Sequence, residues 1–241
     1  MLEAFRARAP NAGILLDFDG TISEIVDRPE IASPASGARD VLAALVERYA
    51  LVAVITGRRA EDVARLLAVE GLRYEGLYGL QESVPDLAGA LLSRVEGAAS
   101  VESSAWVEDK GASLAVHYRQ AVDPDGARAR LIEELGPLAT GAGLELVEGK
   151  RVIELVPPHR PLKGGAVERV AEEWALEAVL IAGDDVADLD AFAAADRLAS
   201  RGLETVKVAV RGEDTPTELM DSADLVVEGP AGLVVLLRTL A

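Results

Sequence analysis

Short apolar runs alternate with amphipathic stretches over the first third of the chain and again over the last third. In the first third, strands are predicted at 14–17, 51–55 and 73–78, and helices at 35–49 and 60–68. In the last third, helices are predicted at 163–174, 187–195 and 231–240, and strands at 179–182, 205–210 and 225–227. Strands that alternate with helices are typical of a parallel sheet, so we expect both ends of the chain to build one α/β core.

The alternation breaks in the middle of the chain. Strands are predicted at 105–108, 113–119, 144–147 and 152–156, with helices only at 124–138 and near 85–95. Consecutive strands with few helices indicate an antiparallel α+β unit. We therefore expect a Rossmann-like parallel-sheet core of residues 1–82 and 159–241, interrupted by an α+β domain of residues 83–158, with crossings at Pro85 and at Pro157-Pro158.

Two carboxylates follow the first predicted strand, in the segment ILLDFDGT at 14–21. Side chains at positions i and i+2 of a strand point to the same side, so Asp17 and Asp19 can converge on one point. Such a pair can bind a hard cation such as Mg²⁺, and one of the two can attack phosphorus to form an aspartyl-phosphate. A polar strand exit with an Asp-Gly turn would give the same residues.

A second acidic group follows the apolar run 178–183. Asp184 and Asp185 end that run, and Asp188 and Asp190 lie at the start of the next predicted helix. Like charges at this spacing repel one another unless a cation neutralises them. A shared metal ion is the simplest common cause of two acidic strand ends in one α/β chain.

Two further features lie between the acidic groups. The strand 51–55 ends in the sequence TGR at 56–58, where the hydroxyl of Thr56 and the backbone N–H groups can hold a phosphate oxygen. Lys163 opens the helix before the second acidic strand and can supply a positive charge to a phosphate. Taken singly, Thr56 could instead be an ordinary N-cap of the next helix, and Lys163 could be an ordinary exposed lysine. Ligands of open α/β sheets bind beyond the carboxyl ends of the strands, which is where these residues are expected to meet.

The net charge of −17 argues against nucleic acid and anionic membranes as partners. It also argues that a phosphate could approach the acidic cluster only if a divalent cation and Lys163 reverse the local charge.

The composition favours a soluble enzyme. Half of the 241 residues are hydrophobic and 4% are aromatic, so the core is expected to consist mostly of Ala, Leu and Val. The chain has no cysteine, which excludes disulfides and a cysteine nucleophile. Neither a basic segment followed by a sustained apolar stretch at the N-terminus nor an apolar run of membrane-span length occurs. We expect a cytoplasmic protein, monomeric or weakly homo-oligomeric.

The ordered set of motifs resembles the four motifs of the haloacid dehalogenase superfamily of phosphohydrolases. The segments 107–119, 149–158 and 183–192 are similar to those of trehalose-6-phosphate phosphatases. The resemblance extends from about Gly13 to the C-terminus. The four core motifs specify the superfamily, whereas the segments in the inserted domain specify the sugar-phosphate family.

The resemblance implies a catalytic core and a substrate-selecting cap (83–158) that covers the strand ends. It implies that Asp17 is the nucleophile and that Asp19 is the general acid and base. The implied Mg²⁺ ligands are the Asp17 carboxylate, the Asp19 carbonyl and Asp184. The resemblance also implies that Thr56 and Lys163 bind the oxygens of the phosphoryl group that is transferred. Asp185 and Asp188 would support the metal ion or Lys163, and Gly20 and Arg58 would contact the substrate.

In the cap, the resemblance implies four contacts to the hydroxyls of the sugar distal to the phosphate, made by Glu108, Lys110, Arg119 and Glu154. Charged side chains with several hydrogen-bonding groups suit sugar recognition, although solvated strand faces would carry the same residue types. We interpret His117 as a structural histidine with a satisfied hydrogen bond. His159 lies in a loop near Lys163, and its role is open.

Two segments depart from the usual pattern of that family. Ala187 stands where members often have threonine, which removes a hydroxyl near the metal but keeps Asp188. The segment YGLQ at 78–81 stands where they often have His-Gly followed by glutamate. Neither change touches Asp17.

Three functions follow from these observations. The first is Mg²⁺-dependent hydrolysis of trehalose 6-phosphate, the last step of trehalose biosynthesis. The second is hydrolysis of another sugar phosphate, of the sucrose-6-phosphate or mannosyl-3-phosphoglycerate type. The third is an inert regulatory domain that binds a sugar phosphate; such a domain is expected to have lost Asp17, Asp19, Lys163 or Asp184, and this chain keeps all four.

Overall fold

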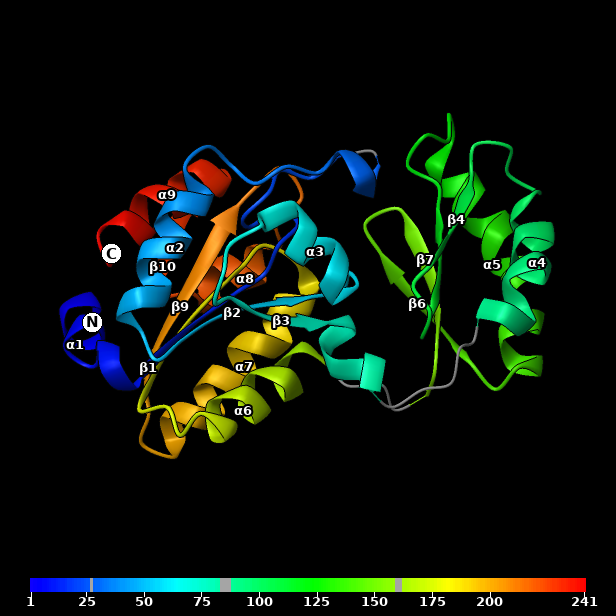
Figure 1. The fold of residues 1–241 in the computed structure, drawn as a ribbon. Coiled ribbons are helices and arrows are strands. Elements are labelled where there is room, and N and C mark those ends of the chain that lie inside the picture. Colours follow the sequence, from blue (N-terminus) through cyan, green and yellow to red (C-terminus); the bar gives the residue numbers. More distant parts are fainter. Residues whose placement is uncertain (27, 83–87, 159–161) are drawn as a thin grey trace. The chain divides into compact units, whose positions relative to one another are not determined.

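The computed structural model describes residues 1–26, 28–82, 88–158 and 162–241. The chain forms two compact units, which Figure 1 shows. The core unit comprises Met1–Gly79 and Pro161–Ala241, and the inserted unit comprises Leu80–Arg160. Two positions singled out from the sequence, Pro85 and His159, lie outside the described residues. The assignment of one unit to catalysis and the other to substrate choice stays a prediction.

A six-stranded parallel sheet forms the centre of the core unit. Its strands are β1 (Ala12–Leu16), β2 (Leu51–Thr56), β3 (Arg73–Gly76), β8 (Ala178–Gly183), β9 (Glu204–Arg211) and β10 (Leu225–Glu228). Their order is β10-β9-β8-β1-β2-β3, and every neighbouring pair is parallel. Strands β1, β2 and β8 are buried along their whole length, which is expected where helices cover both faces of a sheet.

Helices pack on the two faces of this sheet, as Figure 1 shows. One face is covered by α1 (Leu2–Ala7), α2 (Ala38–Arg48), α3 (Ala60–Leu67) and α9 (Gly229–Arg238), and the other by α6 (Lys163–Glu173), α7 (Val186–Ser200) and α8 (Thr217–Ser222). Successive strand residues point to opposite faces, so Ile14 and Leu16 join the first hydrophobic cluster while Leu15 joins the second.

The inserted unit is an antiparallel sheet with two helices on one face (Figure 1). Its strands are β4 (Trp106–Asp109), β5 (Leu114–His117), β6 (Glu145–Gly149) and β7 (Val152–Val156), in the order β4-β5-β7-β6. Helices α4 (Ala88–Ala99) and α5 (Pro124–Gly141) pack on the side chains of Leu114, Val116 and Ile153. The sheet therefore has one apolar face, turned to the helices, and one face that carries polar groups.

The prediction of a parallel α/β core with an inserted α+β unit is confirmed. The strand predicted at 73–78 is too long, because Leu77 and Tyr78 have φ angles of 49° and 54°, which end the extended conformation after Gly76. Helices α1 and α8 were not predicted; each has six residues and buries one side chain, too few for a helical periodicity. Within the described ranges, no helix combines the length and the apolar character that crossing a membrane requires.

An ionic network around the buried carboxylate of Glu75 joins β3 to α6. Glu75 of β3 is 7% exposed and accepts hydrogen bonds from Arg73 Nε at 2.7 Å and from Arg169 Nη2 of α6 at 2.5 Å. Arg73 also binds both carboxylate oxygens of Glu173 in α6, at 2.8 and 2.9 Å. Burial alone would raise the pKa of Glu75, but Arg169 and Arg73 outweigh it, and the pKa lies below its ordinary value.

We expect Glu75→Gln to lower the melting temperature at pH 7 by about 5 °C, because it leaves two arginines without their shared carboxylate. A lowered folded-state pKa gives stability that is present above the unfolded pKa of about 4.3 and is lost as the pH falls through the folded value. The melting temperatures of variant and wild type should therefore converge below about pH 4. Thermal unfolding followed by circular dichroism from pH 3 to pH 8 measures this.

Glu47→Gln is the matched control, because Glu47 is exposed on α2. It should leave the melting temperature unchanged across the same pH range. A difference between Glu75→Gln and wild type that stays constant down to pH 3 would show that the charge of Glu75 is not its source.

Candidate active site

Three of the predicted site residues lie at the carboxyl ends of adjacent strands. Asp17 directly follows β1, Thr56 ends β2, and Asp184 directly follows β8. Since β1 lies between β2 and β8, and all three are parallel, these side chains meet at one edge of the sheet. Their exposed fractions are 8%, 1% and 2%. This is also where the strand order reverses direction, the usual ligand position in an open α/β sheet.

Asp188 completes a group of three buried carboxylates. Asp17, Asp184 and Asp188 each offer an oxygen, and these oxygens lie within 4.8 Å of one another. Asp188 comes from the first turn of α7 and is fully buried. An all-oxygen donor set suits a hard divalent cation such as Mg²⁺. The sequence assigned Asp188 to support, whereas the structure brings its carboxylate into the group itself.

Lys163 supplies positive charge to this group. Its Nζ lies 3.0 Å from Asp17 Oδ1 and 2.5 Å from Asp188 Oδ1, and the residue is 3% exposed. Burial opposes the charged ammonium, but the Asp17 and Asp188 carboxylates outweigh it and raise the pKa of Lys163 above its ordinary value. Lys163 therefore stays protonated and bridges the end of β1 to the start of α7.

One ammonium does not balance three carboxylates. Burial raises the pKa of Asp17 well above its ordinary value; Lys163 opposes this shift, whereas Asp188 and Asp184 add to it. A nucleophilic Asp17 has to be ionised, so a further cation is required beside it. The residues present thus fit a divalent cation by donor type, by spacing and by charge.

Two glycines allow the carboxylates to lie against the backbone. Gly20 has a φ angle of 77°, and a Cβ there would overlap the Asp184 carboxylate. A Cβ on Gly183 would likewise overlap the carboxylate of Asp188. The hydroxyl of Thr21 donates to Asp184 Oδ1 at 3.2 Å, a contact that the sequence analysis missed.

Backbone N–H groups and helix starts orient Asp188. Its Oδ2 accepts from the N–H groups of Asp184 and Asp185, each at 3.0 Å. Asp185 is the N-cap of α7 and accepts from the N–H of Val186 at 2.6 Å. Asp190 accepts from the N–H of Gly164 at 2.6 Å and so caps α6 from the neighbouring helix. The start of α6, and with it Lys163, is therefore positioned by α7.

Asp19 and Arg58 form a bidentate ion pair. Arg58 Nε and Nη2 donate to Asp19 Oδ2 and Oδ1, both at 2.7 Å, and Nη1 donates to the carbonyl of Pro29 at 2.8 Å. The guanidinium also lies 5.3 Å from the centre of the Phe18 ring. The sequence assigned Arg58 to the substrate, whereas the structure shows it holding the carboxylate proposed as acid and base. No sequence signal links these residues, which are 39 positions apart.

Tyr78 lies beside Lys163. The ring centre is 5.9 Å from Lys163 Nζ, and the hydroxyl lies next to Gly57, against the TGR segment. Leu77, Tyr78 and Gly79 all have positive φ angles, of 49°, 54° and 87°. The N–H of Leu77 donates to the carbonyl of Arg58 at 3.0 Å, which ties this turn to the TGR segment. The sequence showed Tyr78 only as a departure from a family pattern.

The residues predicted to bind sugar lie in the inserted unit. Glu154 accepts from Ser113 Oγ at 2.6 Å and lies 3.4 Å from Lys110 Nζ. Arg119 Nε donates to the carbonyl of Lys150 at 3.2 Å. Glu108 binds His117, in agreement with the interpretation of His117 as a histidine with a satisfied hydrogen bond.

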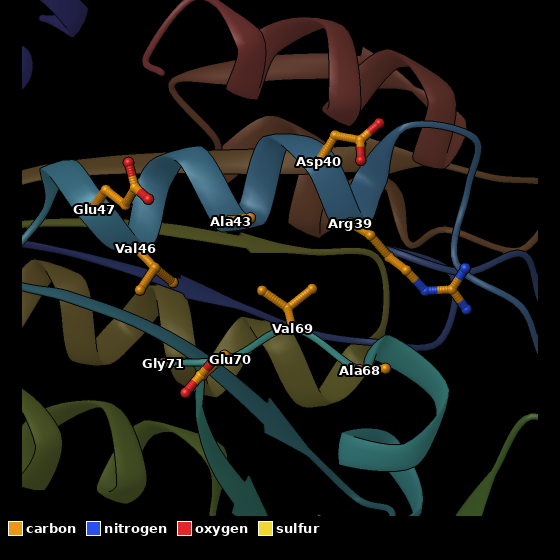
Figure 2. Close-up of a pocket in the computed structure, with 9 residues that line it drawn as sticks. All are labelled: Arg39, Asp40, Ala43, Val46, Glu47, Ala68, Val69, Glu70 and Gly71. Atoms are coloured by element: carbon orange, nitrogen blue, oxygen red, sulfur yellow. The ribbon is translucent and has the colours of Figure 1, made fainter.

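A separate pocket of about 530 Å³ lies between α2 and the segment 68–71 (Figure 2). Figure 2 shows Val46 on α2 and Val69 on the facing segment, and the lining also includes the acidic residues Asp40, Glu47 and Glu70. None of its lining residues belongs to the group at the strand ends. The pocket therefore plays no part in the chemistry considered below.

The two units together have the fold of haloacid dehalogenase-like hydrolases. A haloacid dehalogenase-like hydrolase from Bacteroides thetaiotaomicron has the same fold, with a TM-score of 0.67 at 14% identity, over 96% of this chain and 100% of that chain. The C-terminal domain of Candida albicans trehalose-6-phosphate phosphatase gives a TM-score of 0.79 at 20% identity, over 99% of this chain and 95% of that chain.

The family follows from the sequence comparisons. The trehalose-phosphatase family model matches residues 15–89 and 96–223. The trehalose-phosphate phosphatase of Mycobacterium avium is 34% identical over 225 residues, 83% of this chain. The chain belongs to the trehalose-phosphatase family. It spans 55% of the length of the Mycobacterium avium relative and 15% of a longer Mycobacterium tuberculosis relative at 35% identity.

Proposed function

We propose that this protein hydrolyses trehalose 6-phosphate to trehalose and phosphate with the help of Mg²⁺, the last step of trehalose biosynthesis. The observation that carries the proposal is the buried group of Asp17, Asp184 and Asp188 around Lys163, in a chain of the trehalose-phosphatase family. The core unit would be the catalytic domain, and the inserted unit would select the substrate. We also propose that the protein is cytoplasmic, that it is monomeric or weakly self-associating, and that it has no nucleic-acid or membrane partner.

The phosphate would bind at the carboxyl ends of β1, β2 and β8. Lys163 and the hydroxyl of Thr56 would contact its non-bridging oxygens. Mg²⁺ would be held by the carboxylates of Asp17 and Asp184 and by the carbonyl of Asp19, and it would offset the charge of the incoming phosphate. Asp188 would keep Lys163 beside Asp17, and Gly20 would let the backbone approach the substrate.

The first step forms a covalent bond to the protein. A carboxylate oxygen of Asp17 attacks phosphorus while the bond from phosphorus to the sugar oxygen breaks. Asp19, in its protonated form, gives its proton to the leaving sugar oxygen, so that trehalose departs as a neutral alcohol. Asp19 is paired with Arg58 in the structure, so its side chain would have to turn from Arg58 to reach the leaving oxygen.

The second step regenerates the protein. Asp19, now ionised, takes a proton from a water molecule as the water oxygen attacks the phosphorus of the aspartyl-phosphate. The bond from phosphorus to Asp17 breaks, and inorganic phosphate leaves. Asp19 thereby recovers the proton that it gave away in the first step, and Asp17 recovers its carboxylate.

The sugar would be recognised by the inserted unit. Ionised Glu108 and Glu154 would accept hydrogen bonds from sugar hydroxyls, and Lys110 and Arg119 would donate to sugar oxygens. Another sugar phosphate remains the alternative substrate, because the same four side chains suit any polyhydroxylated ligand.

Phosphate release from a panel of esters tests the proposal. Trehalose 6-phosphate, sucrose 6-phosphate, glucose 6-phosphate and mannosyl-3-phosphoglycerate are each incubated with the protein and Mg²⁺, with EDTA as control. A strong preference for trehalose 6-phosphate that EDTA abolishes is expected. A preference for another ester would keep the mechanism and replace the substrate, whereas no release from any ester would favour the inert regulatory domain.

We expect Asp17→Asn to lower kcat on the preferred ester about a thousandfold or more, because an amide does not replace the attacking carboxylate. The melting temperature should stay within a few degrees of wild type, since the variant removes a buried charge and keeps the shape of the side chain. Retained turnover by a correctly folded Asp17→Asn protein would remove Asp17 from the nucleophilic role.

Mg²⁺ binding can be measured without turnover. A ligand that binds the native state alone at 100 times its Kd stabilises that state by about 2.7 kcal/mol, which raises the melting temperature of a chain of this size by about 5–10 °C. We expect this rise for wild type and its loss in Asp184→Asn. Asp221→Asn, at an exposed position of α8, should respond like wild type. An undiminished rise in Asp184→Asn would place the cation elsewhere.

A further inference from the structure

The polar face of the inserted sheet carries two glutamates, one on each side of a single alanine. Ala115 of β5 pairs in register with Glu108 of β4 on one side and with Glu154 of β7 on the other. Side chains paired in register point to the same face of a sheet, so the three lie in one row. Leu114 and Val116, one position before and after Ala115, pack with the helices on the other face.

The two carboxylates are held in different ways. Glu154 is held by the hydroxyl of Ser113 at 2.6 Å and by the ammonium of Lys110 at 3.4 Å. Glu108 Oε2 lies 2.9 Å from His117 Nε2. An ionised carboxylate only accepts hydrogen bonds, so Nε2 of His117 is the donor.

The ring of His117 is itself fixed in place. Trp106 and His117 are paired in register on β4 and β5, and their rings stack with centres 4.1 Å apart and an angle of 10° between their planes. The side chain of His117 is only 11% exposed. The stack therefore fixes the plane of the imidazole, and the hydrogen bond to Glu108 fixes which edge of the ring faces that carboxylate. Trp106, His117 and Glu108 form a row in which each side chain orients the next.

An unrestrained glutamate on a strand face samples many rotamers, and binding a ligand through it would cost side-chain entropy. A donor fixed at 2.9 Å restricts that sampling before the ligand arrives. A carboxylate has about four acceptor sites, so one hydrogen bond from His117 does not by itself prevent Glu108 from accepting others.

We propose that His117 is a positioning residue for sugar recognition: held by Trp106, it sets the orientation in which Glu108 accepts hydroxyl groups of the substrate. This inference rests on the proposed function, in which Glu108 contacts the sugar. It assigns His117 a role in substrate selectivity rather than in the stability of the fold alone.

Two substitutions separate the donor from the ring. His117→Phe keeps an aromatic ring against Trp106 but removes the donor, and His117→Gln keeps an N–H donor but removes the ring. The kinetic constants of each variant are measured on trehalose 6-phosphate and on para-nitrophenyl phosphate, which has no sugar. Loss of an orienting contact worth one ordinary hydrogen bond predicts that KM on the sugar phosphate rises about five- to tenfold more than KM on the aryl ester in His117→Phe. His117→Gln should recover part of this loss, and kcat should change less than KM.

A double-mutant cycle tests whether His117 acts through Glu108. In a Glu108→Ala background, adding His117→Phe should cause little further loss of selectivity, because the carboxylate that it orients is already gone. Losses that multiply in the double variant would show that His117 acts independently of Glu108 and would overturn the proposal. An equal loss on both esters would also overturn it, because a purely structural role affects both alike.

A further variant keeps the proposal testable if His117→Phe does not fold. Trp106→Leu keeps the donor and removes the ring on which it stacks, and it should reduce selectivity in the same direction. Wild-type selectivity in Trp106→Leu would overturn the proposed row of residues. If the wild-type protein prefers another sugar phosphate, the substrate assignment fails. The same variants are then compared on that ester and on para-nitrophenyl phosphate. A loss confined to the sugar phosphate supports the role of His117, and an equal loss on both esters overturns it.

Discussion

The contact between Lys163 and the two carboxylates of Asp17 and Asp188 is the interaction on which the core unit depends. Each partner comes from a different element: the end of β1, the first residue of α6 and the first turn of α7. All three are nearly or fully buried, where an unpaired charge is very unfavourable. The parallel sheet brings these three elements together, and the ion pairs offset the free-energy cost of burying the charged groups there.

Several smaller features follow from this constraint. A lysine at the start of a helix meets the positive end of the helix dipole, which is unfavourable unless carboxylates compensate it. Asp17 and Asp188 provide that compensation, and Asp190 caps the same helix start through Gly164. The absence of side chains at Gly20 and Gly183 leaves the space that the carboxylates of Asp184 and Asp188 occupy. The acidic site is therefore built from backbone as much as from side chains.

The sequence predicts the sheet because strands buried on both faces are continuous apolar runs, which are easy to recognise between amphipathic helices. It also predicts which carboxylates meet, since the ends of parallel strands share one edge. It does not show the pairing of Asp19 with Arg58, because that contact depends on where a loop places a long side chain. Nor does it show the turn at Leu77 and Tyr78, since neither residue type favours the left-handed conformation that both adopt.

The two units hold their carboxylates in contrasting ways. In the core unit three carboxylates each offer an oxygen within 4.8 Å of the others, an arrangement that suits a cation better than an anion. In the inserted unit Glu108 and Glu154 stand on separate strands with Ala115 between them, each oriented by its own donor. Separated, oriented acceptors suit the spaced hydroxyls of a neutral sugar. Under the proposed function, the carboxylate group would serve a charged ligand in the core unit, as aspartate, and an uncharged sugar in the inserted unit, as glutamate, and the spacing of the carboxylates would decide which.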